Sequence, residues 1–398
     1  MMQEKFDLIV VGGGMVGLAT AVSCSRQGLR VAIVEPNEPA LDWPAGIDLR
    51  VSAITRASQA MFESAGVWPQ IVSDGVSAFE KMKVWDSTGN GLVHFDSAEL
   101  GEPYLGHIIE NRIITKALYL EAKESKLISV YCPAKMQRFT LHDDSVDVVL
   151  DNETVLTAAL LIGADGTRSK VRESAGIAVY GWEYAQKGVV ATVKTERPHE
   201  ATAWQRFLPT GPLAFLPLYD GRCSIVWSLD SRRADEIMAL DDVDFVLALE
   251  NAFEKRLGHV VSVSSRAAFP LRLQQARHYI EKRIALVGDA AHTIHPLAGQ
   301  GVNLGFNDVT ALTRHLSEAH QAGRDIGSQL VLRRYEREQR ASNLGMMAAT
   351  DGFYRLFGNE ILPLRLARNA GMNLVNQVGV VKNLLARRAM GLPAAWHV

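Results

Sequence analysis

The sequence predicts an α/β fold in which buried parallel strands alternate with helices, an antiparallel sheet is inserted in mid-chain, and helices form the C-terminal end. Three patterns lead to this prediction. Short apolar runs followed by glycine turns and helical segments occur near the N-terminus and again after residue 280. Between them, runs rich in β-branched and aromatic residues are separated by Pro and Gly turns. From Gln329 onward the apolar spacing is helical.

Composition places the chain among ordinary globular proteins. Its 398 residues are 47% apolar and 22% charged, and the net charge is −2 with Lys and Arg scattered along the chain. No basic face of the kind that binds nucleic acid is expected. Three cysteines, Cys24, Cys132 and Cys223, lie far apart and fit neither a disulfide framework nor a zinc site, which favours a reducing compartment.

The apolar N-terminal run resembles a signal peptide or a membrane anchor only at first sight. It lacks a basic segment and a cleavage site, and Asp7 and several glycines interrupt it. No other segment approaches the ~20 apolar residues that a spanning helix needs. We therefore expect a cytoplasmic protein, or one that is at most peripheral at the inner face of a membrane.

The first predicted strand, Phe6–Val11, leads directly into a glycine turn and a helix. The turn reads G-x-G-x-x-G, and the next strand ends on Glu35. In this context the pattern is typical of a Rossmann-like dinucleotide site. Gly12 permits the tight turn, Gly14 permits close approach of a pyrophosphate, and Gly17 permits helix–strand packing. Glu35 is expected to bind ribose hydroxyls. The alternative is a βα turn that binds no nucleotide.

A second strand that stops at an acidic residue is predicted near residue 160. The run LLIGADGTRSKVR leads into Asp165-Gly166 and then a helix start with Ser169 and Arg172. Taken alone, an Asp-Gly pair is a common turn. Together with the glycine turn, it suggests one extended dinucleotide held at several places.

The third such strand, Ile284–Val287, breaks at Gly288-Asp289. The chain then passes through His295-Pro296 and a glycine turn before a helix starts near Gly301. A strand end bearing a carboxylate and a helix start with free N–H groups face one spot in such an arrangement. This suits a polar cofactor with hydroxyl groups and a developing negative charge.

The middle of the chain predicts an antiparallel sheet followed by a helix. Four short runs between Val189 and Ser228 are separated by turns, and the helix Val243–Leu257 carries apolar residues at spacing four. These apolar strands suit an apolar ring with an apolar tail. Phe215 and Pro217 are the candidates for facing the substrate, although most such side chains belong to an ordinary core.

After Pro363, the segment Leu364–Met390 is amphipathic and basic. A segment of this kind contacts an anionic membrane or a partner protein, or it packs on its own domain as a solvated face.

Several motifs in this order resemble those of the single-component FAD-dependent aromatic hydroxylases related to p-hydroxybenzoate hydroxylase. They are Gly12–Gly17, Asp165-Gly166 with Ser169 and Arg172, and Gly288-Asp289 with His295-Pro296. Within that group, HPLAGQGVNLGFND, LRVSAI, GHIIEN and LPLYDGRCSIVWS resemble the ubiquinone-biosynthesis hydroxylases. The similarity extends over nearly the whole chain, to RAMGL near its end.

The resemblance implies FAD as resident cofactor and NAD(P)H as transient reductant. Arg50 and Arg112 would lie along the pyrophosphate and ribityl chain, although either fits a solvated surface arginine. Asp289 would accept from ribityl hydroxyls, Pro296 would lie against the ring, and the N–H groups of Gly301, Val302 and Asn303 would face the ring edge that becomes negative. The implied cofactor-binding set is Gly12, Gly14, Gly17, Glu35, Arg50, Arg112, Asp165, Gly166, Asp289, Pro296, Gly301, Val302 and Asn303.

The resemblance also implies a reaction. A flavin C4a-hydroperoxide would hydroxylate the aromatic ring of a polyprenyl phenol in ubiquinone biosynthesis, with O₂ as co-substrate. His295 is a candidate for a catalytic base, or else a structural residue. Two alternatives stay open: a flavin-dependent reductase or dehydrogenase of a lipid-like substrate, and a non-catalytic flavin-bearing carrier in a biosynthetic complex. A homo-oligomer is compatible with either.

A metal site is the remaining chemical alternative. Asp289, His292 and His295 stand at three-residue spacing and could imitate an iron site on a helix. Pro296 and the glycines after it argue against one continuous helix there, so we expect no metal.

These patterns divide the chain into four parts. Residues 1–180 form the first part of the FAD-binding domain, with a small substrate-side insertion near 75–110. Residues 181–275 form the antiparallel-sheet substrate domain, 276–330 the second part of the FAD-binding domain, and 331–398 a helical C-terminal region.

Overall fold

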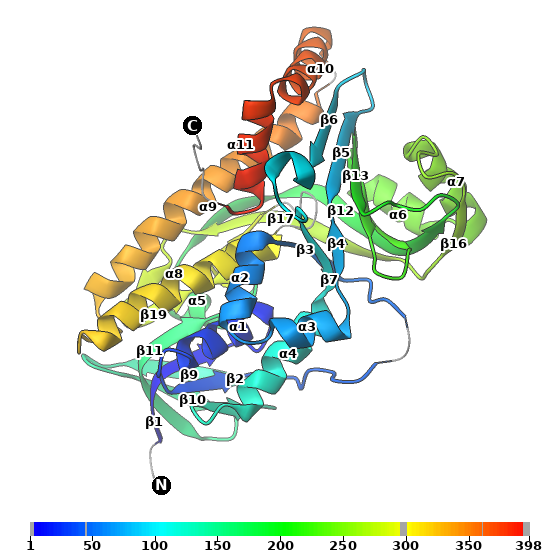
Figure 1. The fold of residues 1–398 in the computed structure, drawn as a ribbon. Helices are drawn as coiled ribbons and strands as arrows, with labels where there is room; N and C mark the ends of the chain where they lie inside the picture. The colour runs from blue at the N-terminus through cyan, green and yellow to red at the C-terminus, as the bar shows by residue number, and fades with distance from the viewer. Residues whose placement is uncertain (1–3, 44–45, 295–300, 360, 393–398) are drawn as a thin grey trace.

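The computed structural model describes residues 4–43, 46–294, 301–359 and 361–392. It is a mixed α/β structure with two large sheets, a small sheet between them and a helical C-terminal end (Figure 1). The predicted fold class is confirmed.

The first sheet is built around parallel strands in the order β19-β11-β1-β2-β8, with β18 at one edge and the hairpin β9-β10 on β11. Leu8, Ile9 and Val10 in β1 are fully buried, as expected of a parallel strand covered on both faces. The bounds are β1 Glu4–Val11, β2 Val31–Val34, β8 Ile128–Tyr131, β9 Met136–Leu141, β10 Val146–Leu150, β11 Val155–Gly163, β18 Ile280–Glu281 and β19 Ile284–Leu286.

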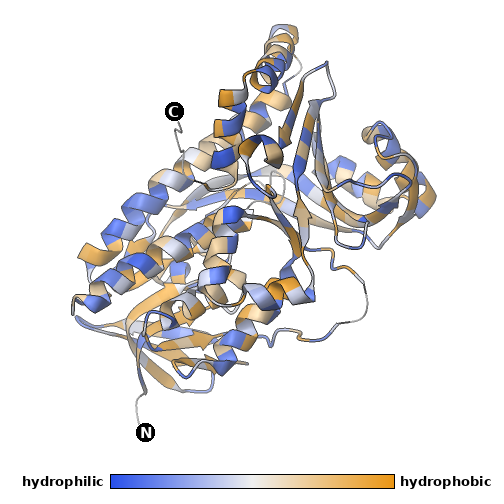
Figure 2. Cartoon of the chain, viewed as in Figure 1, coloured by the Kyte–Doolittle hydropathy of each residue, from blue (hydrophilic) through white to orange (hydrophobic). Residues whose placement is uncertain are grey.

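Helices α1, α4 and α8 pack together beside this sheet. Nearly every residue of α1 is buried, whereas α8 is amphipathic and buries one stripe. In Figure 2 the strands below these helices are orange, while α8 alternates between blue and orange. The bounds are α1 Met15–Ser25, α4 Asn111–Glu124, α5 Lys170–Ser174 and α8 Gly301–Gln321.

The second sheet follows the order β20-β17-β12-β15-β14-β13-β5-β6, with β16 on β12. Its pairs are antiparallel apart from β13 with β5, which is parallel. This differs from the prediction of a purely antiparallel sheet within 181–275, because β5, β6 and β20 join it from other parts of the chain. The bounds are β5 Lys81–Asp86, β6 Leu92–Asp96, β12 Val179–Thr195, β13 Thr202–Leu208, β14 Gly211–Pro217, β15 Cys223–Asp230, β16 Val260–Val263, β17 Ala267–Ala276 and β20 His292–Thr293.

One face of the second sheet is covered by α6 and α7. Phe245, Leu249 and Phe253, the predicted apolar stripe, are all buried there. The other face meets the small sheet β3-β7-β4 and the end of α11. The bounds are α6 Ser231–Ala239, α7 Asp242–Ala252, β3 Val51–Thr55, β4 Ser77–Phe79, β7 Gly106–Glu110, α2 Arg56–Ser64, α3 Trp68–Asp74, and the 3₁₀ turns η1 Ser97–Leu100 and η2 Gly288–Ala290.

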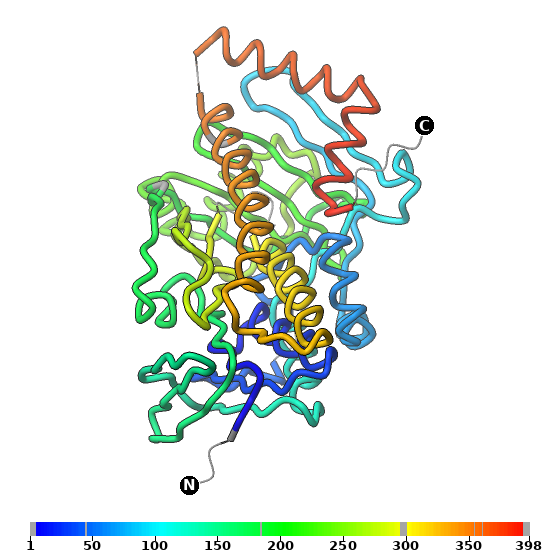
Figure 3. The backbone as a smooth tube through the Cα atoms, turned by 90° about the vertical axis from the view of Figure 1, so that its left-hand side faces the viewer, coloured from blue at the N-terminus to red at the C-terminus, as the bar shows by residue number. Residues whose placement is uncertain are grey.

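The C-terminal helices are α9 Gln329–Phe357, α10 Leu362–Gln377 and α11 Gly379–Ala389. Figure 3 shows α9 running beside α8 toward the end of the molecule opposite the N-terminus, where α10 and α11 form a hairpin beside β5 and β6. The predicted segment Leu364–Met390 is therefore helical but broken at Val378. No helix within the described residues is long and apolar enough to cross a membrane.

Candidate cofactor site

Four parallel strands bring their carboxyl ends to one edge of the first sheet. Val11 of β1 pairs with Val34 of β2 and with Gly163 of β11, and Gly163 pairs with Leu286 of β19. The residues that follow these strand ends are therefore neighbours in space. A site outside the carboxyl ends of parallel strands is the usual ligand position in such sheets.

The glycine turn after β1 packs against the end of the neighbouring strand β11. Gly12 has φ +112°, and an added Cβ would lie 2.3 Å from the Ala164 carbonyl oxygen. An added Cβ at Gly17 would lie 1.9 Å from the Gly12 carbonyl oxygen. At Gly14 it would meet nothing within 4 Å. Gly12 and Gly17 thus permit backbone packing, whereas Gly14 faces open space at the start of α1.

Glu35, at the tip of β2, lies against this turn. Its Oε2 accepts a hydrogen bond from the Gly13 N–H at 2.5 Å, and its Oε1 accepts from the Asn37 N–H at 3.0 Å. The carboxylate is half-buried and fixed in place. It lies where the second half of a dinucleotide would leave the glycine turn.

Asp165 follows β11 and uses only one of its oxygens. Oδ2 accepts from the N–H groups of Lys170 at 2.6 Å and Val171 at 3.1 Å, which fixes the start of α5. Oδ1 is buried and accepts no hydrogen bond from any described residue. Gly166, with φ +77°, allows the turn. A buried acceptor without a partner is what a ligand hydroxyl would satisfy.

Arg172 joins the turns that carry the two aspartates. Its Nη2 donates to the Thr167 carbonyl at 2.8 Å and its Nη1 donates to the Ala290 carbonyl at 2.9 Å. Ser169 accepts from the Arg172 N–H at 3.0 Å and caps α5. The side chain of Arg172 is buried, so these bonds fix the spacing between the two turns.

Asp289, in η2, is exposed, yet desolvation by the protein around it raises its pKa. His292, a hydrogen bond from Thr167 and the charge of Arg50 act in the opposite direction. The Thr167 Oγ1 to Asp289 Oδ2 distance is 3.5 Å. The carboxylate of Asp289 is thus accessible at its surface while the protein packed around it disfavours its charged form.

The two arginines named from the sequence have different surroundings. Arg50 is exposed, with its guanidinium 5.3 Å from the centre of the Phe269 ring and its charge acting on Asp289. Arg112 pairs with Glu110 at 2.7 Å, donates to the Gly46 carbonyl and lies 4.5 Å from the Trp43 ring centre. The Nε of Arg112 is buried and donates to no described group.

Helix α8 begins at Gly301, and its first N–H groups have no partner within the helix. The Asn303 side chain ties this helix start to β3 and α2. Its Oδ1 accepts from the Ser58 hydroxyl at 2.7 Å and its Nδ2 donates to the Ala53 carbonyl at 2.7 Å. The start of α8 is thereby held at the small sheet. His295 and Pro296 lie outside the described residues.

Sequence reasoning missed a buried polar network behind Asp289. Asp308 accepts from the Gly288 N–H at 2.9 Å, from His292 Nε2 at 2.6 Å and from Asn343 at 3.3 Å. Burial alone lowers the pKa of His292, but the charge and hydrogen bond of Asp308 and the charge of Asp289 outweigh it, and the net pKa is raised. The spacing of residues along the helix could have indicated that Asp308 is buried, because it lies four residues from Leu304 and from Leu312 on the buried stripe of α8.

The two substrate candidates lie in β14, whose side chains alternate between the faces of the second sheet. Phe215 is 1% exposed and stacks on Phe253, with ring centres 3.8 Å apart, on the side of α6 and α7. Pro217 is buried two residues further along the same strand, so alternation places it on that side. Leu216 faces the other side, toward the small sheet. Phe215 therefore packs in the core between the second sheet and α7, which is the alternative expected for such side chains.

The described residues fit an extended dinucleotide. The open position at Gly14, the unpaired oxygen of Asp165, the accessible carboxylate of Asp289 and the start of α8 lie around one sheet edge. Between them they offer N–H donors for a pyrophosphate, acceptors for hydroxyls and a helix N-terminus for developing negative charge.

Comparison with known proteins agrees with this geometry. The family model described as "FAD binding domain" matches residues 5–350. The chain is 37% identical over 393 residues to 3-demethoxyubiquinol 3-hydroxylase of Escherichia coli, covering 98% of this chain and 100% of that protein. It is 38% identical over 385 residues to ubiquinone hydroxylase UbiL of Rhodospirillum rubrum, covering 97% and 89%. The crystal structure of p-nitrophenol 4-monooxygenase PnpA from Pseudomonas putida shares the fold, with TM-score 0.78, 20% identity and 100% of both chains covered.

Proposed function

The chain belongs to the FAD-binding family of ubiquinone-biosynthesis hydroxylases, and we propose that it hydroxylates the ring of an apolar, prenylated phenol. The oxidant is O₂, and NAD(P)H, which binds only transiently, is the reductant. The observation that carries the proposal is the meeting of Gly14, Asp165, Asp289 and the start of α8 at one sheet edge. In this proposal residues 1–180 and 276–330 hold the cofactor, 181–275 cover the substrate and 331–398 form the helical end.

The residues have separate roles in the proposal. Gly12 and Gly17 shape the turn, and Gly14 lets the pyrophosphate approach. Glu35 receives the adenosine ribose, while Asp165 and Asp289 accept from hydroxyls of the cofactor. Arg50 and Arg112 would lie along the phosphates, and Gly166 would allow the turn that carries Asp165. Pro296 would lie against the flavin ring. The N–H groups of Gly301, Val302 and Asn303 would face the edge of that ring.

Bound FAD, once reduced, supplies the oxygen-activating chemistry. The chain contributes orientation and electrostatics. The N–H groups at the start of α8 stabilise negative charge on the ring edge. The second sheet keeps water from the reacting atoms. His295 is our candidate for accepting the proton of the phenol. Overall, one oxygen atom of O₂ enters the ring, the other leaves as water, and NAD(P)H provides the two electrons.

A membrane surface is the proposed source of the substrate. The segment 361–392 contains no Asp or Glu and five Lys or Arg residues, Arg365, Arg368, Lys382, Arg387 and Arg388. Two of these are buried and paired with acids of other elements, Arg368 with Asp86 and Lys382 with Glu99, so the positive charge left for a membrane is that of the other three. Large apolar side chains on the helices of this segment are more than half exposed: Leu362, Leu366, Leu374 and Val380. Apolar contact together with a positive charge excess suits an anionic bilayer.

The reaction is tested by reducing the FAD-loaded protein with NADH or NADPH without oxygen, and then admitting ¹⁸O₂ with a prenylated 4-hydroxyphenyl substrate. We expect the flavin to bleach and the product to gain one labelled oxygen. A product formed under strict anaerobiosis would favour the reductase alternative. Flavin that neither reductant bleaches would favour the carrier.

The cofactor assignment is tested separately with Asp289→Ala. Loss of a charged hydrogen-bond acceptor is expected to weaken FAD binding by about tenfold or more. The exposed Asp144→Ala is the control. A fully yellow Asp289→Ala protein would remove the proposed role of this carboxylate.

A further inference from the structure

A cavity of about 70 Å³ lies between α11 and the small sheet, far from the glycine turn in sequence. Its walls are apolar, with Thr55 the exception among the described lining residues. They are Ala53, Ile54, Thr55, Phe79, Met82, Phe95, Leu105, Leu385, Ala386, Ala389 and Met390. A water molecule needs two to four polar partners, so a cavity with a single hydroxyl suits hydrocarbon.

The inner wall of the cavity adjoins the candidate cofactor site. Thr55, at the end of β3, donates its backbone N–H to Asn303 Oδ1 at 3.1 Å. Asn303 lies in the first turn of α8, where the flavin ring is proposed to bind. One strand therefore separates the apolar cavity from the place where a substrate ring would react.

The outer wall is α11, which is attached by polar contacts around an apolar face. The Met390 carbonyl accepts from the Ala57 N–H at 3.3 Å, Lys382 pairs with Glu99 at 2.5 Å, and Arg387 donates to the Leu100 carbonyl at 3.1 Å. Leu385 lines the cavity and is also 47% exposed. The cavity thus reaches the surface beside Leu385 and Ala389, within the segment 361–392 that contains no Asp or Glu.

We propose that this cavity binds part of the isoprenoid tail of the substrate, which enters from the surface beside α11 and leads toward the ring at the start of α8. The inference rests on the proposed function. A phenol ring would leave its hydroxyl short of partners among these side chains, whereas a branched hydrocarbon loses nothing by leaving water. The tail rather than the ring is therefore the occupant.

The test fills the cavity from its exposed rim. Ala389 is exposed, so Ala389→Trp is expected to fold and to place its ring at the mouth. Turnover is compared for a farnesyl-bearing phenol and for the same phenol with a methyl group in place of the tail, in cyclodextrin without vesicles. We expect the ratio of the two kcat/KM values to fall by roughly tenfold or more, as loss of several buried methylene groups predicts. Ala370→Trp, at an exposed alanine of α10, is the control.

A second pair of variants gives an independent readout. Leu385→Ala removes a side chain that lines the cavity. Leu384→Ala removes a neighbouring side chain that is 39% exposed and does not line the cavity. Binding of farnesol, a tail without a ring, is measured by titration calorimetry. Leu385→Ala is expected to weaken it about threefold or more, and Leu384→Ala to leave it as in the original protein.

The outcomes separate this inference from the proposed function. If the original protein hydroxylates both phenols but Ala389→Trp leaves their ratio unchanged, the tail site is wrong and the function stands. If neither phenol is hydroxylated but Ala389→Trp abolishes farnesol binding, the tail site stands and the function is wrong. If farnesol does not bind the original protein, the tail site is overturned.

Discussion

Gly14 and Gly17 lie three residues apart in one motif, yet they are glycines for different physical reasons. At Gly17 a side chain would overlap the backbone of Gly12, which is a requirement of folding. At Gly14 a side chain would enter open space, and φ is −75°, which any residue adopts. Glycine is a good helix N-cap at this position, and the open space beside it would let the pyrophosphate of a bound dinucleotide approach the backbone.

We therefore expect Gly14→Ala to act mainly on FAD affinity and Gly17→Ala mainly on stability. Gly14→Ala should lower the free energy of unfolding by about 1 kcal/mol or less, because alanine is only a poorer helix N-cap. Its affinity for FAD should fall by about tenfold or more, since the methyl group occupies the approach of the pyrophosphate. Gly17→Ala should lower stability by more than about 2 kcal/mol. Urea unfolding and FAD titration measure both; a Gly14→Ala protein with unchanged FAD affinity would refute the assignment.

The pair of His292 and Asp308 makes stability depend on pH. His292 has a raised pKa in the folded protein, so this interaction contributes fully below about pH 6.5 and is lost as the pH rises through the folded-state pKa. Asp308, Asp289 and the Tyr279 ring, 5.7 Å away, face it. Asp308→Asn should cost about 3–5 kcal/mol at pH 6, and less at higher pH, since it leaves His292 buried without its partner.

Urea unfolding of both proteins between pH 6 and pH 9 measures this dependence. The difference in unfolding free energy between them should shrink as the pH rises. A difference that stays constant over this range would mean that His292 is neutral in the folded protein.

The sequence predicted the acidic strand ends but not this network, and the reason is physical. Glu35, Asp165 and Asp289 each follow a strand, so local pattern places them. Asp308 is placed by three-dimensional packing: its partners are 16 residues away at His292 and 35 away at Asn343. Only its position on a buried helical stripe was visible in the sequence.

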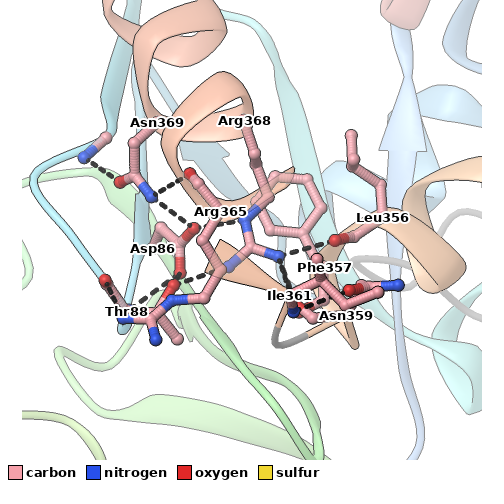
Figure 4. Close-up of polar contacts among 10 residues, drawn as sticks. Asp86, Thr88, Leu356, Phe357, Asn359, Ile361, Arg365, Arg368 and Asn369 are labelled. Atoms are coloured by element: carbon pink, nitrogen blue, oxygen red, sulfur yellow. Dashed lines mark hydrogen bonds and ion pairs between the residues drawn. The ribbon is translucent and has the colours of Figure 1, made fainter. Parts of the chain in front are cut away.

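Among the elements, α10 is attached to the β5–β6 hairpin by a buried ion pair. Arg368 and Asp86, each with a side chain 1% exposed, form this pair (Figure 4). Arg368 donates to the Thr88 hydroxyl, and the Asn369 side chain donates to Asp86. Arg368 also donates to the carbonyls of Leu356, Phe357 and Asn359 at the end of α9. One side chain thus fixes the turn between two helices and the position of their exposed apolar face.

Arg368→Ala should release this corner. It leaves Asp86 buried without its main counter-charge, at a cost of about 3–5 kcal/mol. Hydrogen exchange should therefore quicken within 361–392 and in the β5–β6 hairpin. Arg355→Ala, which breaks an exposed pair with Asp351, is the control and should change stability by less than about 1 kcal/mol. Unchanged protection in Arg368→Ala would contradict the role of the pair.

Local patterns also explain which elements were predictable. The strands β1, β2, β11 and β19 of the first sheet and helix α7 follow from apolar runs and spacing, whereas β8, β9, β10 and β18 were not predicted. The parallel pairing of β5 with β13 was not predictable, because Thr202 and Lys81, which pair there, are far apart in the chain. The break at Val378 between α10 and α11 is likewise set by packing on β6 and η1, since the apolar spacing continues through it.

At the scale of the whole molecule, the exposed apolar helices lie at the end opposite the N-terminus (Figure 3). Figure 2 shows hydrophobic residues along α10 and α11 at this end. The cavity under α11 opens on the same side, so membrane contact and entry of an apolar tail would use one face. This arrangement links the proposed source of the substrate to its proposed path.

Binding to lipid vesicles tests this face. The protein should sediment with vesicles rich in phosphatidylglycerol, and less with pure phosphatidylcholine or at high salt. The triple variant Leu362→Asp, Leu366→Asp, Val380→Asp should weaken this binding by about tenfold or more. The control is Val243→Asp with Leu247→Asp, which places charges on exposed positions of α7. Equal binding by both variants would exclude this surface.

In the cofactor site proposed above, one FAD molecule spans the carboxyl ends of the first sheet. The most direct measurement is the electron density of FAD in crystals of the loaded protein. We predict the pyrophosphate beside Gly14, a ribityl hydroxyl within hydrogen-bond distance of Asp289, and the ring edge at the N–H groups of Gly301 to Asn303. A flavin bound elsewhere, with Asp289 facing only solvent, would show that this sheet edge is not the cofactor site.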